Sequence, residues 1–247
     1  MSSADSAPSA PSAPSAPSAP SARPLVPLWP TPLGVHHWAS AQEINPLLVR
    51  VLGSLRAVSQ SQGAPFFASE DDLLERIRLP EWQEFVRFVV DSLHATVAQA
   101  NQGAWPRQTP ALQVHLRGMW FQVANQGASH DVHTHGNCSW SGVYCVQVDD
   151  PERRVADPVL GERNGVTRFY GPYFPLLGGA HADLGNAYLQ SAHLDIAPLP
   201  GQLIVFPSWL AHQAMAYRGE RDRIIVSFNA SVHAAQGGDR LRAYAAA

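Results

Sequence analysis

The chain has 247 residues, of which 45% are hydrophobic, and its net charge is −3. This length predicts one catalytic domain with extensions, and a negative charge without a basic cluster argues against nucleic acid or an anionic membrane as the main partner. All 17 basic residues are arginine, which excludes Schiff-base and P-loop lysine chemistry and leaves arginine, hydroxyls and backbone N–H groups to hold an anion.

Three features of the sequence bear on where the protein works. The two cysteines, Cys138 and Cys145, are too few for a disulfide framework and suit a reducing compartment. No apolar run approaches the length of a membrane span, and the N-terminus has neither the charged start nor the apolar core of a signal peptide. We therefore expect a cytoplasmic protein; the sequence carries no signal for its oligomeric state.

Both ends of the chain are predicted to be tails. Ser-Ala-Pro repeats with a period of three over residues 6–22. Such a segment cannot bury apolar surface, so we expect residues 1–24 to be disordered. A passive linker is favoured over a ligand for an SH3-type domain, because no basic residue flanks a Pro-x-x-Pro core before Arg23. Residues 236–247 form a shorter C-terminal tail.

Residues 25–110 predict helices that pack on the rest of the domain. Asn45-Pro46 has the signature of a helix start and is followed by apolar residues on one helical face. Ser69 with Asp72 three residues later resembles a capping box for a short helix. A longer apolar stripe over residues 82–97, with charge on the opposite side, predicts a second packing helix.

Residues 111–235 predict the β-rich core. The apolar pattern alternates over seven segments: 112–116, 120–124, 130–135, 141–148, 202–206, 210–217 and 223–231. Between them, residues 149–186 are rich in Gly, Pro and aromatics without a clear period, which is typical of a functional loop or lid. Helices followed by seven or eight short strands predict an α+β protein with a double-stranded β-helix core, the cupin-like jelly roll.

Two histidines one residue apart, His133 and His135, predict a metal-chelating pair. Alternate residues of a strand project to the same face, so both imidazoles can close on one cation. The predicted third ligand is His212, which lies 79 residues after His133 in Phe206-Pro-Ser-Trp-Leu-Ala-His212. A barrel brings an early and a late strand to face each other in this way. Asp131 shares the parity of the pair and is the alternate ligand.

Two further histidines, His193 and His130, lie in the same β-rich region of the sequence. His193-Leu-Asp195 matches an H-x-D pattern, but it lies too close to His212 for the chain to cross the barrel and return. We interpret it as a strand-edge pair. His130 has the opposite parity to His133, so we expect it to face away from the metal, as a substrate contact or a support for a ligand.

A series of short motifs resembles a family of bacterial 2-oxoglutarate- and Fe(II)-dependent oxygenases. The motifs are Asn125-Gln-Gly127, His133-x-His135, Ser141-Gly-Val-Tyr144, Pro200-Gly201, Phe206-Pro-Ser-Trp-Leu-x-His212, and Arg223 with Ser227-Phe-Asn229. The likeness is to small single-domain members and runs from Leu28 to Val232. It implies that Fe(II) and 2-oxoglutarate are the cofactors. It also implies that O₂ and 2-oxoglutarate hydroxylate a substrate C–H bond and yield succinate and CO₂.

The resemblance gives a role to Arg223, which follows His212 by 11 residues. A hairpin places its strand beside the His212 strand, and a guanidinium fork suits the distal carboxylate of 2-oxoglutarate. Arg221 shares its parity and is the alternate anchor. Ser227 and Asn229 continue the same face, where cosubstrate binding and simple barrel filling are equally consistent with the pattern.

Three further polar residues are candidates for the pocket: Gln122, Ser141 and Tyr144. The metal set itself departs from the wider superfamily, which usually presents two histidines and one carboxylate to iron. Here the second position is His135. Three neutral imidazoles leave the site one charge unit more positive, and we expect this to tighten the hold on a dianionic cosubstrate.

Two other functions remain open from the sequence. One is a cupin-type metalloenzyme with three histidine ligands that does not use 2-oxoglutarate; the histidines favour it, and Arg223 at its spacing disfavours it. The other is a non-catalytic jelly roll that binds a metal or ligand. The best-supported prediction is a 2-oxoglutarate-dependent dioxygenase that hydroxylates an unidentified small molecule, amino acid or peptide.

Overall fold

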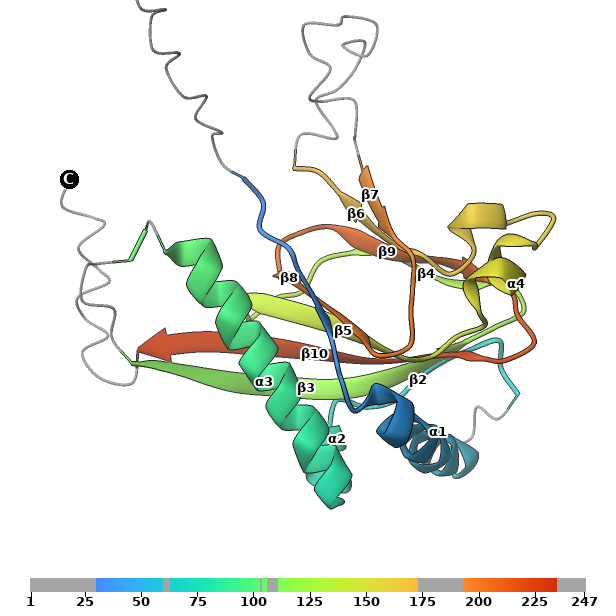
Figure 1. Cartoon of the computed structure of the whole chain (residues 1–247), viewed down its shortest axis with the longest axis horizontal. Helices are drawn as coiled ribbons and strands as arrows, with labels where there is room; N and C mark the ends of the chain where they lie inside the picture. The colour runs from blue at the N-terminus through green and yellow to red at the C-terminus, as the bar shows by residue number, and fades with distance from the viewer. Residues whose placement is uncertain (1–29, 60–62, 103, 106–110, 173–192, 235–247) are drawn as a thin grey trace, which may run out of the picture. The chain divides into compact units, whose positions relative to one another are not determined.

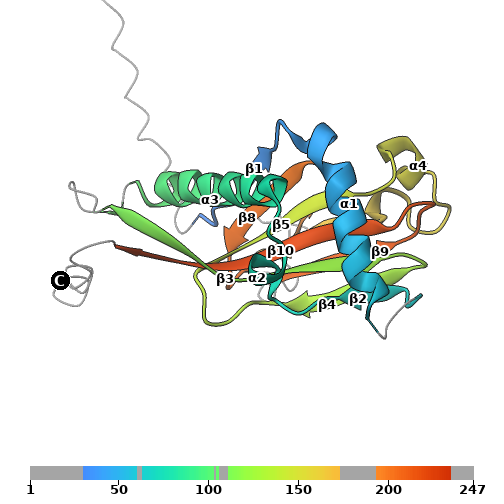
Figure 2. The same ribbon diagram turned by 90° about the horizontal axis from the view of Figure 1, so that it is seen from below.

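Two antiparallel sheets lie face to face, and helices cover the outer side of the larger one (Figures 1 and 2). A computed structural model describes residues 30–59, 63–102, 104–105, 111–172 and 193–234. The elements described below all belong to the unit Thr31–Ala247. The predicted tails 1–24 and 236–247 lie outside the described residues, and the domain boundaries stay predictions.

The strand order identifies the double-stranded β-helix. The larger sheet consists, in order, of β1 (Gly34–His37), β8 (Gln202–Pro207), β5 (Trp140–Gln147), β10 (Arg223–Ala234), β3 (Leu112–Ala124) and β2 (Phe66–Ala68). The smaller sheet consists of β4 (Ala128–His133), β9 (His212–Tyr217), β6 (Thr167–Tyr170) and β7 (His193–Ile196). From β3 to β10 the chain passes back and forth between the two sheets, and every strand pair is antiparallel. The predicted jelly roll is confirmed.

The main core lies between the larger sheet and the helices α1 (Ala41–Ala57), α2 (Leu73–Arg76) and α3 (Pro80–Asn101). Trp82 and Phe85 of α3 are fully buried against this sheet, as the apolar stripe predicts. None of the described helices combines the length and the hydropathy that crossing a membrane requires. The free cysteines Cys138 and Cys145 form no disulfide with each other.

Both predicted helix starts are wrong, because each side chain has a different partner. Helix α1 begins at Ala41, with Pro46 inside it. The buried Asn45 instead donates to the carbonyl of Val146 and accepts a hydrogen bond from Tyr144. Ser69 accepts the N–H of Phe121 in β3 and does not cap α2, so it joins the β2–α2 segment to the sheet.

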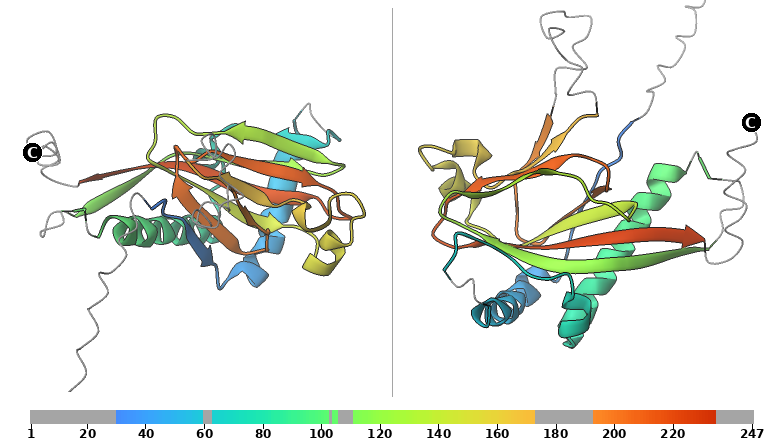
Figure 3. Two further views of the ribbon diagram at one scale, coloured as in Figure 1. Left: turned by 90° about the horizontal axis from the view of Figure 1, so that it is seen from above. Right: turned by 180° about the vertical axis from the view of Figure 1, so that it is seen from behind.

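Several strands differ from the sequence prediction. The predicted segments 112–116 and 120–124 form one continuous strand, β3, which pairs with β10 along its length and contains a register shift (Figure 3). The region 149–186, predicted as one loop, contains α4 (Pro151–Val155), η1 (Gly161–Arg163) and β6; its residues from 173 onward lie outside the described part. Strands β1, β2, β6 and β7 have only three or four residues each, too few for a clear period.

The central strands of the larger sheet present two chemically different faces. Along β10, Val226 and Phe228 pack in the main core under the helices. Arg223 and Ser227, which have the opposite parity, line a pocket between the two sheets. One strand therefore contributes alternately to the core and to the candidate site.

Gly142 in β5 allows this packing, and its substitution should destabilise the fold. A Cβ atom there would lie 2.4 Å from the Phe228 ring and 2.9 Å from the carbonyl oxygen of Ile204. We expect Gly142→Ala to lower the free energy of unfolding by about 1–3 kcal/mol, because the buried ring and backbone have little room to move. Urea denaturation measures the change.

Gly53 provides the matched control. It is exposed within α1, and an added Cβ would meet nothing within 4 Å. Gly53→Ala should raise the free energy of unfolding by up to about 1 kcal/mol, since alanine favours a helix interior. Equal effects of the two substitutions would contradict the packing argument.

Candidate active site

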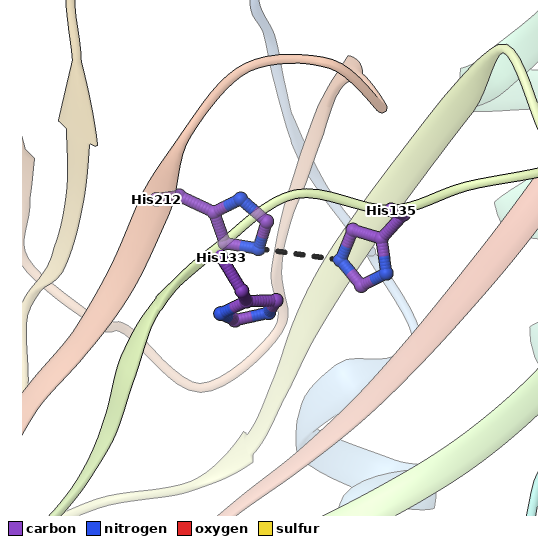
Figure 4. A group of neighbouring side chains, drawn as sticks. All are labelled: His133, His135 and His212. Atoms are coloured by element: carbon purple, nitrogen blue, oxygen red, sulfur yellow. Dashed lines mark hydrogen bonds between the residues drawn. The ribbon is translucent and has the colours of Figure 1, made fainter.

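The three histidines predicted as metal ligands converge between the two sheets. His133 ends β4, His212 begins β9, and His135 lies on the loop between β4 and β5. One ring nitrogen of each lies within 4.8 Å of the others, and Figure 4 shows the three imidazoles close together. The Nε2 atoms of His135 and His212 are 3.3 Å apart.

Backbone carbonyls orient two of the rings. The Nδ1 atom of His133 lies 2.7 Å from the carbonyl oxygen of Asp131, and that of His212 lies 2.9 Å from the carbonyl oxygen of Leu210. A carbonyl only accepts hydrogen bonds, so Nδ1 carries a proton in both rings. The metal-binding atom of each ring is therefore Nε2, and Nε2 of His212 faces Nε2 of His135.

Burial keeps the imidazoles of His135 and His212 neutral at pH 7. It lowers the pKa of His212 to about 3, and the neighbouring His133 and His135 lower it further, while the hydrogen bond to Leu210 opposes the shift. Burial likewise lowers the pKa of His135 to about 4, with a contribution from His133. A neutral imidazole is the form that binds a metal.

The prediction that His133 and His135 project from the same strand is wrong, although their two rings lie close together. Strand β4 ends at His133, so alternation along a strand does not place His135. The backbone N–H of His135 instead donates to the carbonyl of Ser208, at 2.9 Å. The ring of His135 also lies beside that of Trp120, with centroids 5.8 Å apart.

Three other candidate residues do not belong to the histidine cluster. The alternate ligand Asp131 is exposed, and its carboxylate does not belong to the cluster. His130 lines the pocket, contrary to the parity argument, because the pairing of β4 with β9 shifts register on both sides of it. The carboxylate of Asp195, in His193-Leu-Asp195, accepts two hydrogen bonds of 2.7 Å from Arg168.

Arg223 is a buried cation that faces the same pocket. Arg223 is 4% exposed, its Nε has no hydrogen-bond partner, and its Nη2 makes a long contact of 3.4 Å with Thr167 Oγ1. Burial lowers the pKa of Arg223, but a guanidinium stays charged at neutral pH. Among the described residues no carboxylate forms an ion pair with it. A buried positive charge without a carboxylate partner favours the binding of an anion.

The alternate anchor Arg221 points elsewhere. Its guanidinium pairs with Asp149 at 3.2 Å and with Asp150 at 3.3 Å, and its side chain is 49% exposed. Asp149 also accepts the backbone N–H groups of Glu220 and Arg221. These bonds hold the turn between β9 and β10, which sets the strand that begins with Arg223.

The structure places the remaining predicted pocket residues in different surroundings. Gln122 and Ser227 line the pocket as expected. Ser141 is buried next to it and donates to Asn229 Oδ1 at 2.8 Å, so both belong to a polar network. Tyr144 was wrongly predicted: its parity is opposite to that of Ser141, so it lies in the main core and donates to Asn45.

The pocket also contains residues that the sequence did not predict there, among them Trp120 and Thr167. Trp120 pairs with Ser227 across the sheet and shares the parity of Gln122, a signal that the alternation already contained. Thr167 begins β6 and pairs with Ala214 of β9. It lies in a region without a period, so no pattern in the sequence pointed to it.

Residues 118–229 match the family described as "Putative 2OG-Fe(II) oxygenase". This segment is similar to the 2OG-Fe(II) oxygenase family. The match includes the three histidines and Arg223, and it extends from within β3 to within β10. The family so described comprises oxygenases that depend on iron and 2-oxoglutarate. No curated protein sequence matches the chain.

Solved structures of similar fold support the architecture. AviO1 from Streptomyces viridochromogenes Tue57 is 11% identical, with a TM-score of 0.52 over 81% of this chain and 90% of that one. HygX from Streptomyces hygroscopicus, solved with nickel and 2-oxoglutarate, is 12% identical, with a TM-score of 0.51 over 81% and 82%. A Pseudomonas putida prolyl-4-hydroxylase is 12% identical, with a TM-score of 0.50 over 81% and 93%. At such identities the likeness shows the fold alone.

The donor set of the pocket fits a divalent transition metal. Imidazole nitrogen is a common ligand of iron, and ligand bonds of about 2.1 Å at right angles separate two nitrogens by about 3.0 Å. The separation of 3.3 Å between the Nε2 atoms of His135 and His212 is close to that value. No carboxylate joins the three imidazoles in the described part of the chain.

Proposed function

We propose that the chain is an Fe(II)- and 2-oxoglutarate-dependent dioxygenase that hydroxylates a small molecule, an amino acid or a peptide. The observation that carries this proposal is the pairing of two features in one pocket. Three imidazoles gather at one part of it, and the buried guanidinium of Arg223, whose Nε has no hydrogen-bond partner, lies at another. A ligand with a metal-chelating end and a carboxylate end satisfies both, and 2-oxoglutarate is such a molecule.

In this proposal His133, His135 and His212 hold Fe(II) through Nε2. When bound, the metal supplies the centre at which O₂ and 2-oxoglutarate react to give succinate, CO₂ and a hydroxylated substrate. The hydrogen bonds from His133 and His212 to backbone carbonyls fix both rings before the metal arrives. Three neutral ligands leave the double positive charge of the ion undiminished, which favours a dianionic cosubstrate.

Arg223 is the proposed anchor for the distal carboxylate. A guanidinium with an unused Nε and a terminal nitrogen presents the fork that a carboxylate matches with two parallel hydrogen bonds. Thr167 supports the guanidinium, and Ser227 and Gln122 line the space beside it. The chain's part in the reaction is to bind, orient and desolvate the cosubstrate.

The proposed partners are therefore small molecules and O₂, without nucleic acid. A cytoplasmic location is consistent with Cys138 and Cys145, which are both free thiols. We place the substrate beside the half-buried Trp120 and His130, which contribute aromatic surface to the pocket.

An anaerobic titration tests the proposal directly. Purified Fe(II) protein is mixed with 2-oxoglutarate in the absence of O₂, and we expect the visible metal-to-ligand charge-transfer band of a bidentate keto acid. Admitting O₂ should then convert 2-oxoglutarate to succinate in a metal-dependent reaction. A cupin-type enzyme with three histidine ligands would bind Fe(II) without the band or the succinate, and that result would overturn the proposal.

A further inference from the structure

His135 is the ligand whose ring has the least support. The rings of His133 and His212 each use Nδ1 to bond a backbone carbonyl, and both residues belong to strands. His135 lies beyond the end of β4, and Figure 4 shows it on an irregular stretch of chain. Its described contacts are the two other imidazoles, the Trp120 ring and one backbone bond. Whatever holds this loop therefore also holds the third ligand.

Ser208 makes most of the bonds that tie this loop to the sheets. Its backbone oxygen accepts the N–H of His135 at 2.9 Å, and its backbone N–H donates to the carbonyl of Ser139 at 3.0 Å. Its hydroxyl lies 3.1 Å from the thiol of Cys138 and 2.9 Å from the hydroxyl of Ser141. Ser208 is 1% exposed, so water does not compete for these bonds.

The hydrogen bonds of this network run in one direction. Asn229 Oδ1 only accepts, so the Ser141 hydroxyl proton points to it, across 2.8 Å. The proton between the two serines must then come from Ser208, and the thiol of Cys138 donates to Ser208. The chain of bonds thus begins on the loop at Cys138 and ends on β10 at Asn229, which fixes the loop to the larger sheet.

We propose that Ser208 is a positioning residue for the metal site: its hydroxyl locks the loop that carries His135 to β5 and β10, and so sets the His135 imidazole against His133 and His212. The inference rests on the proposed function and deepens it. Ser208 itself does not touch the metal, because its hydroxyl is occupied by Cys138 and Ser141. The exposed Trp209 and the ligand His212 follow it in the same turn, so one short motif supplies a ligand and orders another.

The test compares four variants of the full chain. Ser208→Ala removes the hydroxyl and keeps both backbone bonds. Cys138→Ala removes the thiol at the half-buried end of the same hydrogen-bond network. It replaces Ser208→Ala in the test if that variant does not fold. Cys138→Ser keeps a donor to Ser208 and is the conservative rescue. Ser40→Ala is the matched control, since its hydroxyl donates to Glu84 at 2.8 Å in the helical layer.

Two readouts separate positioning from general stability. Cobalt(II) alone is titrated, and its visible ligand-field bands report both affinity and coordination. Ser208→Ala should bind cobalt about tenfold more weakly or worse, with altered bands, because residues that orient ligands contribute roughly 10–100-fold to metal affinity. In the metal-free protein, amide hydrogen exchange over residues 134–139 should be faster. Cys138→Ser and Ser40→Ala should resemble the wild type in both readouts.

The outcomes distinguish this inference from the proposed function. If Ser208→Ala and Cys138→Ala bind cobalt with wild-type affinity and bands, and exchange over residues 134–139 is unchanged, the positioning role is overturned. If the wild type itself binds no cobalt, or His212→Ala binds it equally well, the metal-site proposal fails instead. The exchange experiment needs no metal, so it tests the role of the hydroxyl in either case.

Discussion

Arg223→Met should abolish 2-oxoglutarate binding and leave the protein without cosubstrate at least as stable as the wild type. Loss of one partner of a buried charge pair costs about 3–5 kcal/mol, which corresponds to an affinity at least about 100-fold weaker. In the absence of the anion, however, the wild-type guanidinium is buried with an unsatisfied Nε, and a methionine of similar length removes that cost. Thermal unfolding with and without 2-oxoglutarate, in the presence of metal, measures both effects.

Arg221→Met is the matched control for this experiment. The same substitution is made two residues away, at a side chain that pairs with Asp149 and Asp150 outside the pocket. We expect unchanged 2-oxoglutarate affinity and a lower melting temperature, because Asp149 is buried and loses a partner. If Arg221→Met and not Arg223→Met lost the cosubstrate, the assignment of the anchor would be reversed.

His212→Ala should abolish metal binding, whereas His135→Asp should retain it. Removing an imidazole leaves two ligands, which rarely hold a divalent ion, so the loss should exceed the roughly 10–100-fold caused by changes in outer residues. Aspartate at 135 restores the two-histidine, one-carboxylate donor set common among non-haem iron oxygenases. It also removes one unit of positive charge, so we expect 2-oxoglutarate to bind about tenfold or more weakly.

Iron content by elemental analysis and cobalt titration measure these changes. His94→Ala is the control, because His94 is an exposed histidine on α3 away from the cluster. It should leave metal content and 2-oxoglutarate affinity unchanged. Retention of iron by His212→Ala, or its loss in His94→Ala, would contradict the three-histidine site.

Alternation along strands is the part of the site that the sequence predicts well. Arg223 and Ser227 share a parity in β10, and the structure places both in the pocket. The convergence of His212 with His133 follows from the order of strands in a jelly roll, in which β4 and β9 are neighbours. The sequence predicts this placement because a strand offers only two faces and the apolar face is readily recognised.

The errors have physical causes that a local pattern does not contain. Asn45 looks like a helix cap, but its side chain reaches the carbonyl of Val146, about a hundred residues away in the sequence. The register shifts of β4 turn His130 into the pocket. His135 is held by the carbonyl of Ser208, which the chain brings near only after the barrel closes. Tyr144 is different, because its parity is opposite to that of Ser141 and already places it on the core face of β5.

The two-sided character of β10 has an evolutionary consequence. Residues under the helices, such as Val226 and Phe228, are constrained by core packing, while their neighbours Arg223 and Ser227 face the pocket. Selection can therefore alter one set while the other stays constant, within a single strand. Substitutions at the pocket-facing positions can then change the substrate while the core-facing positions preserve the fold.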